Sequence, residues 1–189
     1  MSFKPTPLFG GAITVDLPST YGDTSQIRQV PDHQEVYLDT NGYSGVIFEI
    51  LEYVDKPDEE ALQYHFADLV DGTGDATNLL NQGKGVMENT HPVHTLTFIQ
   101  TPPPPTPSSA HRKAPDYIAI HLLLLRLKDH GTDILITINA PHYPGEYEKP
   151  PSQEGDGGET TTKLMKDADE LRERVLASFD VREWGLFQG

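Results

Sequence analysis

Two glutamates on one apolar stretch, residues 46–53, are the first candidates for binding chemistry in this sequence. Carboxylates placed this way can form ion pairs with a basic partner. Glu49 and Glu52 are three residues apart, so a regular strand directs them to opposite faces. Glu52 then shares its face with Phe48 and Ile50, which places it toward the core.

A lone buried carboxylate costs several kcal/mol even after the protein relaxes around it. Two arrangements avoid that cost. In the first, the strand ends or bulges near Leu51 and both acids stay solvated. In the second, Glu52 pairs with a cation, either Arg28 or Arg126. The sequence leaves both open.

A Pro-Asp turn leads into the alternating stretch at residues 35–39 and places polar side chains at its start. Asp32 can either hydrogen-bond its own turn or contact a partner. Gln34 and Glu35 have opposite strand parity, so we expect only one of them to face outward. Arg28, just before the turn, is either a partner-facing charge or an internal clamp for these acids.

Other motifs that could carry chemistry fail on spacing. His91 and His94 lie in a Pro-containing loop, and no third ligand stands at a fixed spacing from them, so hydrogen-bonded or solvated histidines are the simpler interpretation. The loop 71–75 begins like a calcium loop, but Ala76 and Gln82 stand where glycine and glutamate are needed. We therefore expect no catalytic residues, no metal and no cofactor.

Alternation and turn residues predict six strands in a mostly antiparallel sheet. The predicted strands span residues 12–17, 35–39, 45–54, 95–101, 117–127 and 134–139. Asn41-Gly42 and residues 128–133 are turn sequences, which joins two pairs of these strands as hairpins. The stretch 117–127 is apolar on both parities, so we expect a central strand that is covered on both faces.

Two helices complete the α+β fold class, a six-stranded sheet flanked by helices. Residues 57–70 begin with proline and three acids that suit the positive end of a helix dipole. Phe66 belongs to the apolar stripe of this helix, and we expect its neighbour His65 to be half-exposed. The second helix, residues 163–179, has one apolar face made of Leu164, Ala168, Leu171, Val175 and Phe179.

The composition narrows the choice of partners. The 189 residues fit one domain, and their net charge of −15 argues against nucleic acid or an anionic membrane and favours a basic protein surface. The sequence has no cysteine and its N-terminus lacks the apolar core of a signal peptide, so we expect a soluble intracellular protein.

Two stretches, residues 102–116 and 144–161, look like flexible insertions because they are rich in Pro or Gly and lack apolar periodicity. We expect that either can be shortened without loss of folding. The run of prolines at 102–107 is also compatible with a ligand for an SH3-type domain.

The segment Ile27–Asp39, together with Leu8–Ile13, closely resembles the family of Ran guanine nucleotide release factors, which are Ran-binding nuclear-import factors. The resemblance extends to Val46–Leu69, to Ile118–Pro141 and to the terminal helix through Phe187. It implies one Ran-binding domain over residues 1–189, with the PsbP-like α/β/α sandwich fold and helices on both faces of the sheet.

The resemblance also implies a function. A member would bind the small GTPase Ran and stimulate release of its guanine nucleotide without catalysing a reaction, as a monomer in the nucleus and cytoplasm. In the family an acidic pair on the apolar strand contributes to the GTPase-binding surface, and Glu49 and Glu52 occupy those positions. The implied partner-binding residues are Arg28, Asp32, Gln34, Glu35, Glu49 and Glu52.

Two other classes of function stay open. A small-ligand carrier would enclose an apolar cavity lined by Phe48, Phe66 and Leu123. A trafficking adaptor or scaffold would use the same sheet surface, or the proline-rich loop, on a different partner.

Overall fold

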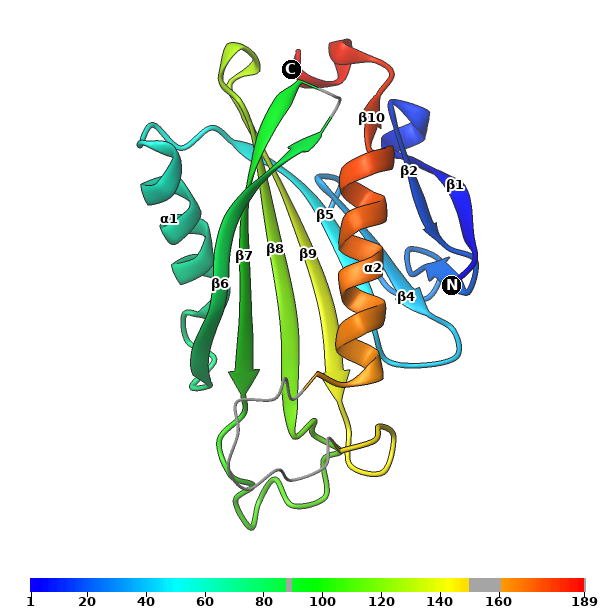
Figure 1. The fold of residues 1–189 in the computed structure, drawn as a ribbon, viewed down its shortest axis with the longest axis vertical. Helices are drawn as coiled ribbons and strands as arrows, with labels where there is room; N and C mark the ends of the chain where they lie inside the picture. The colour runs from blue at the N-terminus through cyan, green and yellow to red at the C-terminus, as the bar shows by residue number, and fades with distance from the viewer. Residues whose placement is uncertain (88–89, 150–160, 189) are drawn as a thin grey trace.

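The computed structural model describes residues 1–87, 90–149 and 161–188, and a seven-stranded antiparallel sheet lies at its centre (Figure 1). The strands are, in order across the sheet, β3 (Tyr21–Asp23), β4 (Gln34–Asp39), β5 (Gly45–Glu52), β9 (Thr132–His142), β8 (Tyr117–Leu127), β7 (His91–Thr101) and β6 (Ala76–Met87). A second, three-stranded sheet is formed by β1 (Phe3–Leu8), β2 (Ile13–Pro18) and β10 (Asp180–Val181).

Two α-helices and three short 3₁₀ turns complete the described part of the chain. The helices are α1 (Asp58–Val70) and α2 (Lys163–Ser178), and the 3₁₀ turns are Phe9–Gly11, Lys128–His130 and Trp184–Phe187. Each helix begins and ends within one residue of the predicted position. The Thr162 hydroxyl caps α2 by accepting a hydrogen bond from the Met165 N–H at 3.1 Å. Neither helix is long and apolar enough to cross a bilayer.

The prediction of a six-stranded sheet was wrong in two ways. Residues 12–17 form β2, but this strand pairs with β1 and β10 and not with the main sheet. The main sheet instead gains β3 and β6. The side chains of β6 are exposed from Ala76 through Gln82, so the strand has no alternation of buried and polar residues to reveal it.

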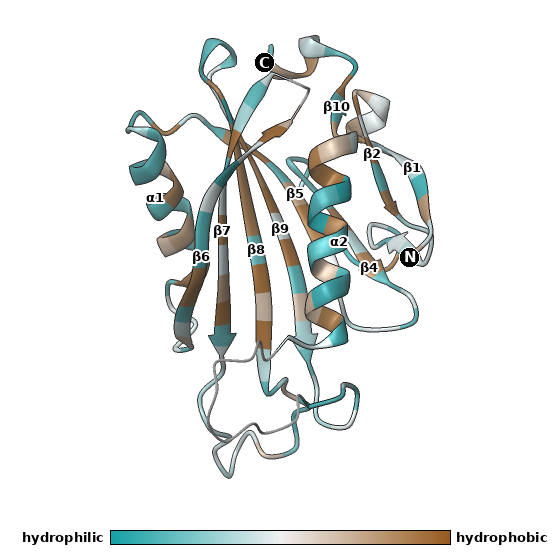
Figure 2. Cartoon of the chain, in the orientation of Figure 1, coloured by the Kyte–Doolittle hydropathy of each residue, from teal (hydrophilic) through white to brown (hydrophobic). Residues whose placement is uncertain are grey.

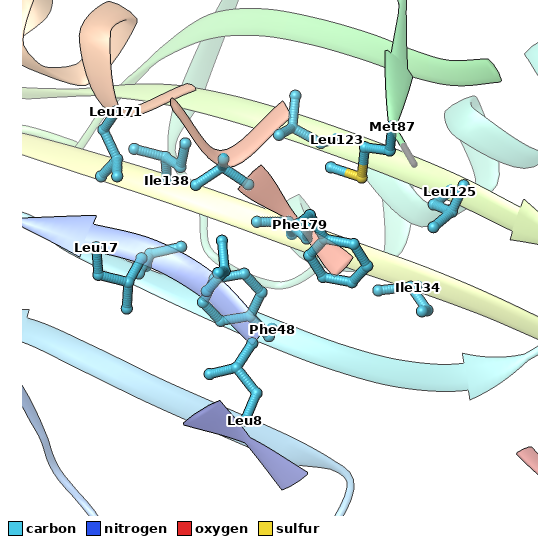
Figure 3. Packing of buried hydrophobic residues seen from close by; sticks show 14 of the residues in the cluster. Leu8, Leu17, Phe48, Met87, Leu123, Leu125, Ile134, Ile138, Leu171 and Phe179 are labelled. Carbon is cyan, nitrogen blue, oxygen red and sulfur yellow. The ribbon is translucent and has the colours of Figure 1, made fainter. Parts of the chain in front are cut away.

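The core has two parts, one on each face of β8, so this strand is covered on both faces as predicted. It lies inside the sheet between β7 and β9 (Figure 1), and Figure 2 shows hydrophobic residues along it. Leu122 and Leu124 pack with Ala61 and Leu62 of α1. On the opposite face are Leu123, Leu125, Leu171 and Phe179 (Figure 3). Val175 of α2 belongs to the same part of the core. Each fully buried leucine stabilises the fold by about 1.5–3 kcal/mol.

The two parts of the core decide against the apolar cavity that a small-ligand carrier would need. Phe48 and Leu123 are fully buried in the part that contains α2, whereas Phe66 packs against the part that contains α1, with its ring 4.9 Å from that of Phe98. The three side chains lie on opposite faces of one sheet, so they cannot line one cavity. The carrier interpretation loses the feature that would have favoured it.

A buried ionic cluster, which we call the Asp133 clamp, joins α1 to the sheet. The Asp133 carboxylate is fully buried and lies 2.9 Å from His65 Nε2 and 3.1 Å from Arg126 Nε. It also accepts a hydrogen bond from the Val54 N–H at 3.1 Å. The expectation of a half-exposed His65 was wrong: its side chain is 4% exposed, because this bond directs it inward.

Arg126 extends the clamp to the chain that follows β5. Its guanidinium donates to the backbone carbonyls of Val54 and Lys56 and lies 3.0 Å from Asp58 at the start of α1. Arg126 is therefore committed to Asp133 and Asp58 and is not the partner of Glu52. The clamp fixes where β5 ends and α1 begins.

His121 gives the fold a pH dependence. It lies on β8 and faces α2, with Nε2 3.0 Å from Asp169 and Nδ1 2.8 Å from the Thr97 hydroxyl. Burial, together with the nearby Arg172, lowers the pKa of His121 to about 4, and Asp169 only partly opposes this. The folded state therefore binds the proton less tightly than the unfolded state, in which the pKa is about 6.5.

We expect the free energy of unfolding to fall by up to about 3 kcal/mol as the pH drops from 6.5 to 4, because protonation favours the unfolded chain in this window. His121→Gln should flatten this part of the curve, while His111→Gln, at an exposed position, should leave it unchanged. Urea unfolding at a series of pH values measures both. An equal slope in wild type and His121→Gln would contradict this assignment.

The predicted insertions contain no helix or strand where they are described, and residues 150–160 of the second lie outside the described part. The two insertions meet at Lys113, whose Nζ lies 2.6 Å from the Tyr43 hydroxyl and 3.3 Å from the Glu146 carboxylate. That both can be shortened stays a prediction, and this contact is the one to preserve when doing so.

Candidate functional site

The six residues implied by the resemblance come from the segment before β4, the start of β4 and the end of β5, and we call them the acidic rim. They are Arg28, Asp32, Gln34, Glu35, Glu49 and Glu52. The two strands are antiparallel neighbours, so the start of one lies beside the end of the other (Figure 1). The Ile50 N–H donates to the His33 carbonyl at 2.9 Å, which places Asp32 alongside the last residues of β5.

Gln34 and Glu49 form the centre of the acidic rim. They are directly opposite in the strand register, and the Gln34 amide donates to the Glu49 carboxylate at 2.9 Å. Both side chains are half-buried, and Glu49 lies across from Leu135, so the pair is on the face of the sheet that carries α1. The bond holds the Glu49 carboxylate in one orientation.

Glu35 points to the other face, toward the small sheet. Its carboxylate accepts a hydrogen bond from the Phe9 N–H at 2.7 Å, within the turn that joins β1 to β2. That turn needs support, because Phe9 has a positive φ of 50°. Only one of the two neighbours Gln34 and Glu35 can be on the α1 face, as the parity predicted, and it is Gln34.

Glu35 carries its charge at some cost to the fold. Burial raises its pKa, with a smaller contribution from Asp23, although the Phe9 N–H opposes the shift. A carboxyl with a raised pKa in the folded state stabilises less as the pH rises through that pKa. Glu35→Gln keeps an acceptor for Phe9, so we expect equal or higher stability than wild type at pH 7.

Thermal melts at pH 7 and pH 4 test this expectation. The difference between Glu35→Gln and wild type should disappear at the lower pH, where the carboxyl becomes protonated in both states. Glu35→Ala, which leaves the Phe9 N–H without its acceptor, should melt lower than Glu35→Gln. Equal melts of the two variants would show that the bond to Phe9 is unimportant.

Glu52 is exposed at the last residue of β5, opposite Thr132. The strand ends at this residue, so the first of the two arrangements left open by the sequence holds for Glu52, whereas Glu49 is half-buried and bonded to Gln34 instead of fully solvated. Arg28 is exposed as well, and none of the ion pairs in the described structure joins it to the acids of the rim. It is therefore not the internal clamp that was the alternative.

Asp32 is exposed, and its turn is closed by the backbone, with the Gln34 N–H donating to the Pro31 carbonyl at 2.9 Å. Asp32 and Glu52 thus present solvated carboxylates at the same end of the two strands, beyond the Gln34–Glu49 pair. The arrangement suits recognition of basic groups by charge.

The Asp133 clamp is the group that sequence reasoning missed. Arg126 and Asp133 are direct cross-strand partners in the hairpin of β8 and β9. The sequence already contained a signal, because the opposite charges of Arg126 and Asp133 stand at positions that a hairpin brings together. His65 lies on a helix, 61 residues before Arg126, so no local sequence pattern could reveal its contact with Asp133.

Comparison with known proteins places the chain among a group of relatives. The family described as Ran-interacting Mog1 protein matches residues 6–141. The Ran guanine nucleotide release factor of Danio rerio is 32% identical over 145 residues, which cover 71% of this chain and 76% of the relative. The nuclear import protein MOG1 of Saccharomyces cerevisiae is 31% identical over 153 residues, covering 75% and 67%.

Solved structures agree with these sequence matches. The crystal structure of the Saccharomyces cerevisiae Ran-binding protein Mog1p superimposes with a TM-score of 0.73 at 26% identity, covering 99% of both chains. The solution structure of PsbP from Synechocystis has a TM-score of 0.55 at 13% identity, covering 95% and 92%, and shows the fold alone. The stretch matched to the family, residues 6–141, includes the whole acidic rim.

Proposed function

The chain belongs to the Ran-interacting Mog1 protein family, and on that premise we propose that it binds the small GTPase Ran and stimulates release of its bound guanine nucleotide in nucleocytoplasmic transport. The observation that carries this proposal is the match to relatives named Ran guanine nucleotide release factor, over about three quarters of both chains. The protein would act by binding rather than by catalysis, as a monomer in the nucleus and cytoplasm.

The acidic rim is the part of the surface that we assign to Ran. Asp32 and Glu52 are exposed carboxylates, and Glu49 is held by Gln34 so that it meets a cation without first losing rotamer freedom. The net charge of −15 adds long-range attraction toward a basic surface. Glu35 contributes indirectly, by holding the turn at Phe9 beside the rim.

Nucleotide release follows from coupled binding. If this protein prefers a conformation of Ran that holds nucleotide weakly, bound nucleotide must weaken the affinity of Ran for this protein by the same factor. The acidic rim would favour that conformation by pairing with basic groups of Ran that are less available in the nucleotide-bound form.

Calorimetric titration tests the proposal through this reciprocity. We expect nucleotide-free Ran to bind more tightly than GDP-loaded Ran, and added GDP to displace the protein. Equal affinity for both forms would refute nucleotide release as the activity, and absence of binding to either form would refute the assignment of Ran as partner.

A further inference from the structure

The outer edge of β6 is a long strand edge that no other described strand covers. β6 ends the main sheet and is 12 residues long, whereas β3 at the opposite edge has only three. Residues Ala76–Gln82 are exposed and carry no charge. An edge of this kind presents unpaired N–H and C=O groups that can accept a further strand, and short or charged edges normally prevent that.

A hollow lies beside β6 on the face of the sheet that carries α1. Gln82 is opposite Leu96 in the register, and Leu96 belongs to the part of the core that contains α1. The hollow has a volume of about 590 Å³ and is lined by Lys56, Glu59, Glu60, Gln63, Tyr64 and Gln82. Its two carboxylates, on Glu59 and Glu60, are exposed and outnumber its one cationic residue, Lys56, so this side of the strand favours a cation.

A second hollow lies beside β6 on the opposite face. Asn78 is opposite Ile99, which packs against the part of the core that contains α2. This hollow has a volume of about 670 Å³, and its lining includes Asn78, Leu80, Ile99, Tyr117, Tyr147 and Met165. Leu80 is 48% exposed, so an apolar surface is open to solvent here.

We propose that the outer edge of β6 at Ala76–Gln82 binds an extended, basic segment of a partner protein as an added strand. Gln82 and Leu80 line opposite hollows although they are two residues apart, because the register of β6 with β7 shifts at a bulge between Leu79 and Asn81. Successive side chains of an added strand point to opposite faces. An added segment with alternating cationic and apolar residues therefore directs its cations toward Glu59 and Glu60 and its apolar side chains toward Leu80. Backbone hydrogen bonds supply affinity in this mode of recognition, and the two hollows supply selectivity.

Charge decides between a basic segment and a second copy of this chain. Two copies carry −15 each, and pairing through β6 brings the carboxylates beside both edges together, which is repulsive. A basic segment meets the same carboxylates favourably. The proposal goes beyond Ran binding and is independent of it, because β9, β8 and β7 separate β6 from the strand that carries Glu49 and Glu52.

The test uses the full chain and a synthetic eight-residue peptide in which lysine and valine alternate. We expect the peptide to bind and to slow amide exchange within Ala76–Gln82. The same peptide with alternate backbone amides N-methylated keeps its charge but loses hydrogen-bond donors, and should bind at least about tenfold more weakly. Equal binding of both peptides, or protection elsewhere than β6, would overturn the proposal.

Matched charge variants separate this site from general attraction to an acidic protein. Glu59→Gln with Glu60→Gln should weaken peptide binding about tenfold, whereas Glu170→Gln with Glu173→Gln, at exposed positions of α2, should change it little. Equal losses in the two double variants would overturn the site. Self-association of the chain with protection of Ala76–Gln82 would assign the edge to a second copy and overturn the proposed occupant.

Discussion

Asp133→Ala is expected to reduce the free energy of unfolding by about 3–5 kcal/mol, because it leaves the buried Arg126 and His65 without their shared carboxylate. The lost bonds are those of 2.9 Å to His65, 3.1 Å to Arg126 and 3.1 Å to the Val54 N–H. Unfolding in urea at pH 7 measures the difference. We also expect α1 to detach from the sheet in this variant. The polar contacts of α1 with the sheet are the bond of His65 to Asp133 and the pairs of Asp58 with His94 and Arg126.

The dependence of stability on pH gives a second test of Asp133→Ala. Burial alone would raise the pKa of Asp133, but bonds from His65, the Val54 N–H and Arg126 outweigh it and lower the pKa. The stabilisation by Asp133 is therefore complete above the ordinary aspartate pKa and is lost as the pH falls through the lowered one.

Asp129→Ala, at an exposed position of the same hairpin turn, is the control and should change stability by less than about 0.5 kcal/mol. A loss at Asp133 as small as this control would contradict the clamp.

Charge reversal of the acidic rim is expected to weaken Ran binding while leaving the fold intact. Glu52→Lys changes an exposed strand end, and Glu49→Lys removes one hydrogen bond from Gln34, so neither places a charge in the core. For the double variant we expect about tenfold slower association at low salt, because exposed interface charges act mainly on the encounter rate. The difference should shrink at high salt.

Stopped-flow mixing with Ran, beside thermal melts of each variant, separates binding from folding. Glu170→Lys with Glu173→Lys is the matched control, since it makes the same change of net charge on α2. An equal slowing in the control would show that total charge matters and the rim does not. Normal binding by a well-folded Glu49→Lys, Glu52→Lys double variant would reject the assignment of the site.

Periodic apolar residues explain what could be predicted from the sequence. The 163–179 helix and the interior strand at 117–127 bury long apolar faces, so their patterns survive in any surroundings. The strand β6 could not be predicted in this way, because pairing with β7 supplies its backbone bonds while its side chains stay exposed. Prolines at positions 5 and 7 hid β1, which tolerates them at the edge of the small sheet.

The acidic rim shows the same division. Strand parity correctly separated Gln34 from Glu35 and Glu49 from Glu52, because a period of two is a local property. The partner of Glu35, Phe9, is 26 residues away and lies in another sheet, and no local pattern reports such a contact. The exposure of Glu52 depends on where β5 ends. The Asp133 clamp fixes that end, through residues that are far from Glu52 in the sequence.

Release of a fluorescent guanine nucleotide from Ran, followed with and without this protein in the presence of excess unlabelled nucleotide, tests the central claim most directly. The account predicts that release accelerates with protein concentration and saturates, and that the Glu49→Lys, Glu52→Lys double variant needs higher concentrations for the same effect. A release rate that stays at its intrinsic value when Ran is saturated with this protein would contradict it.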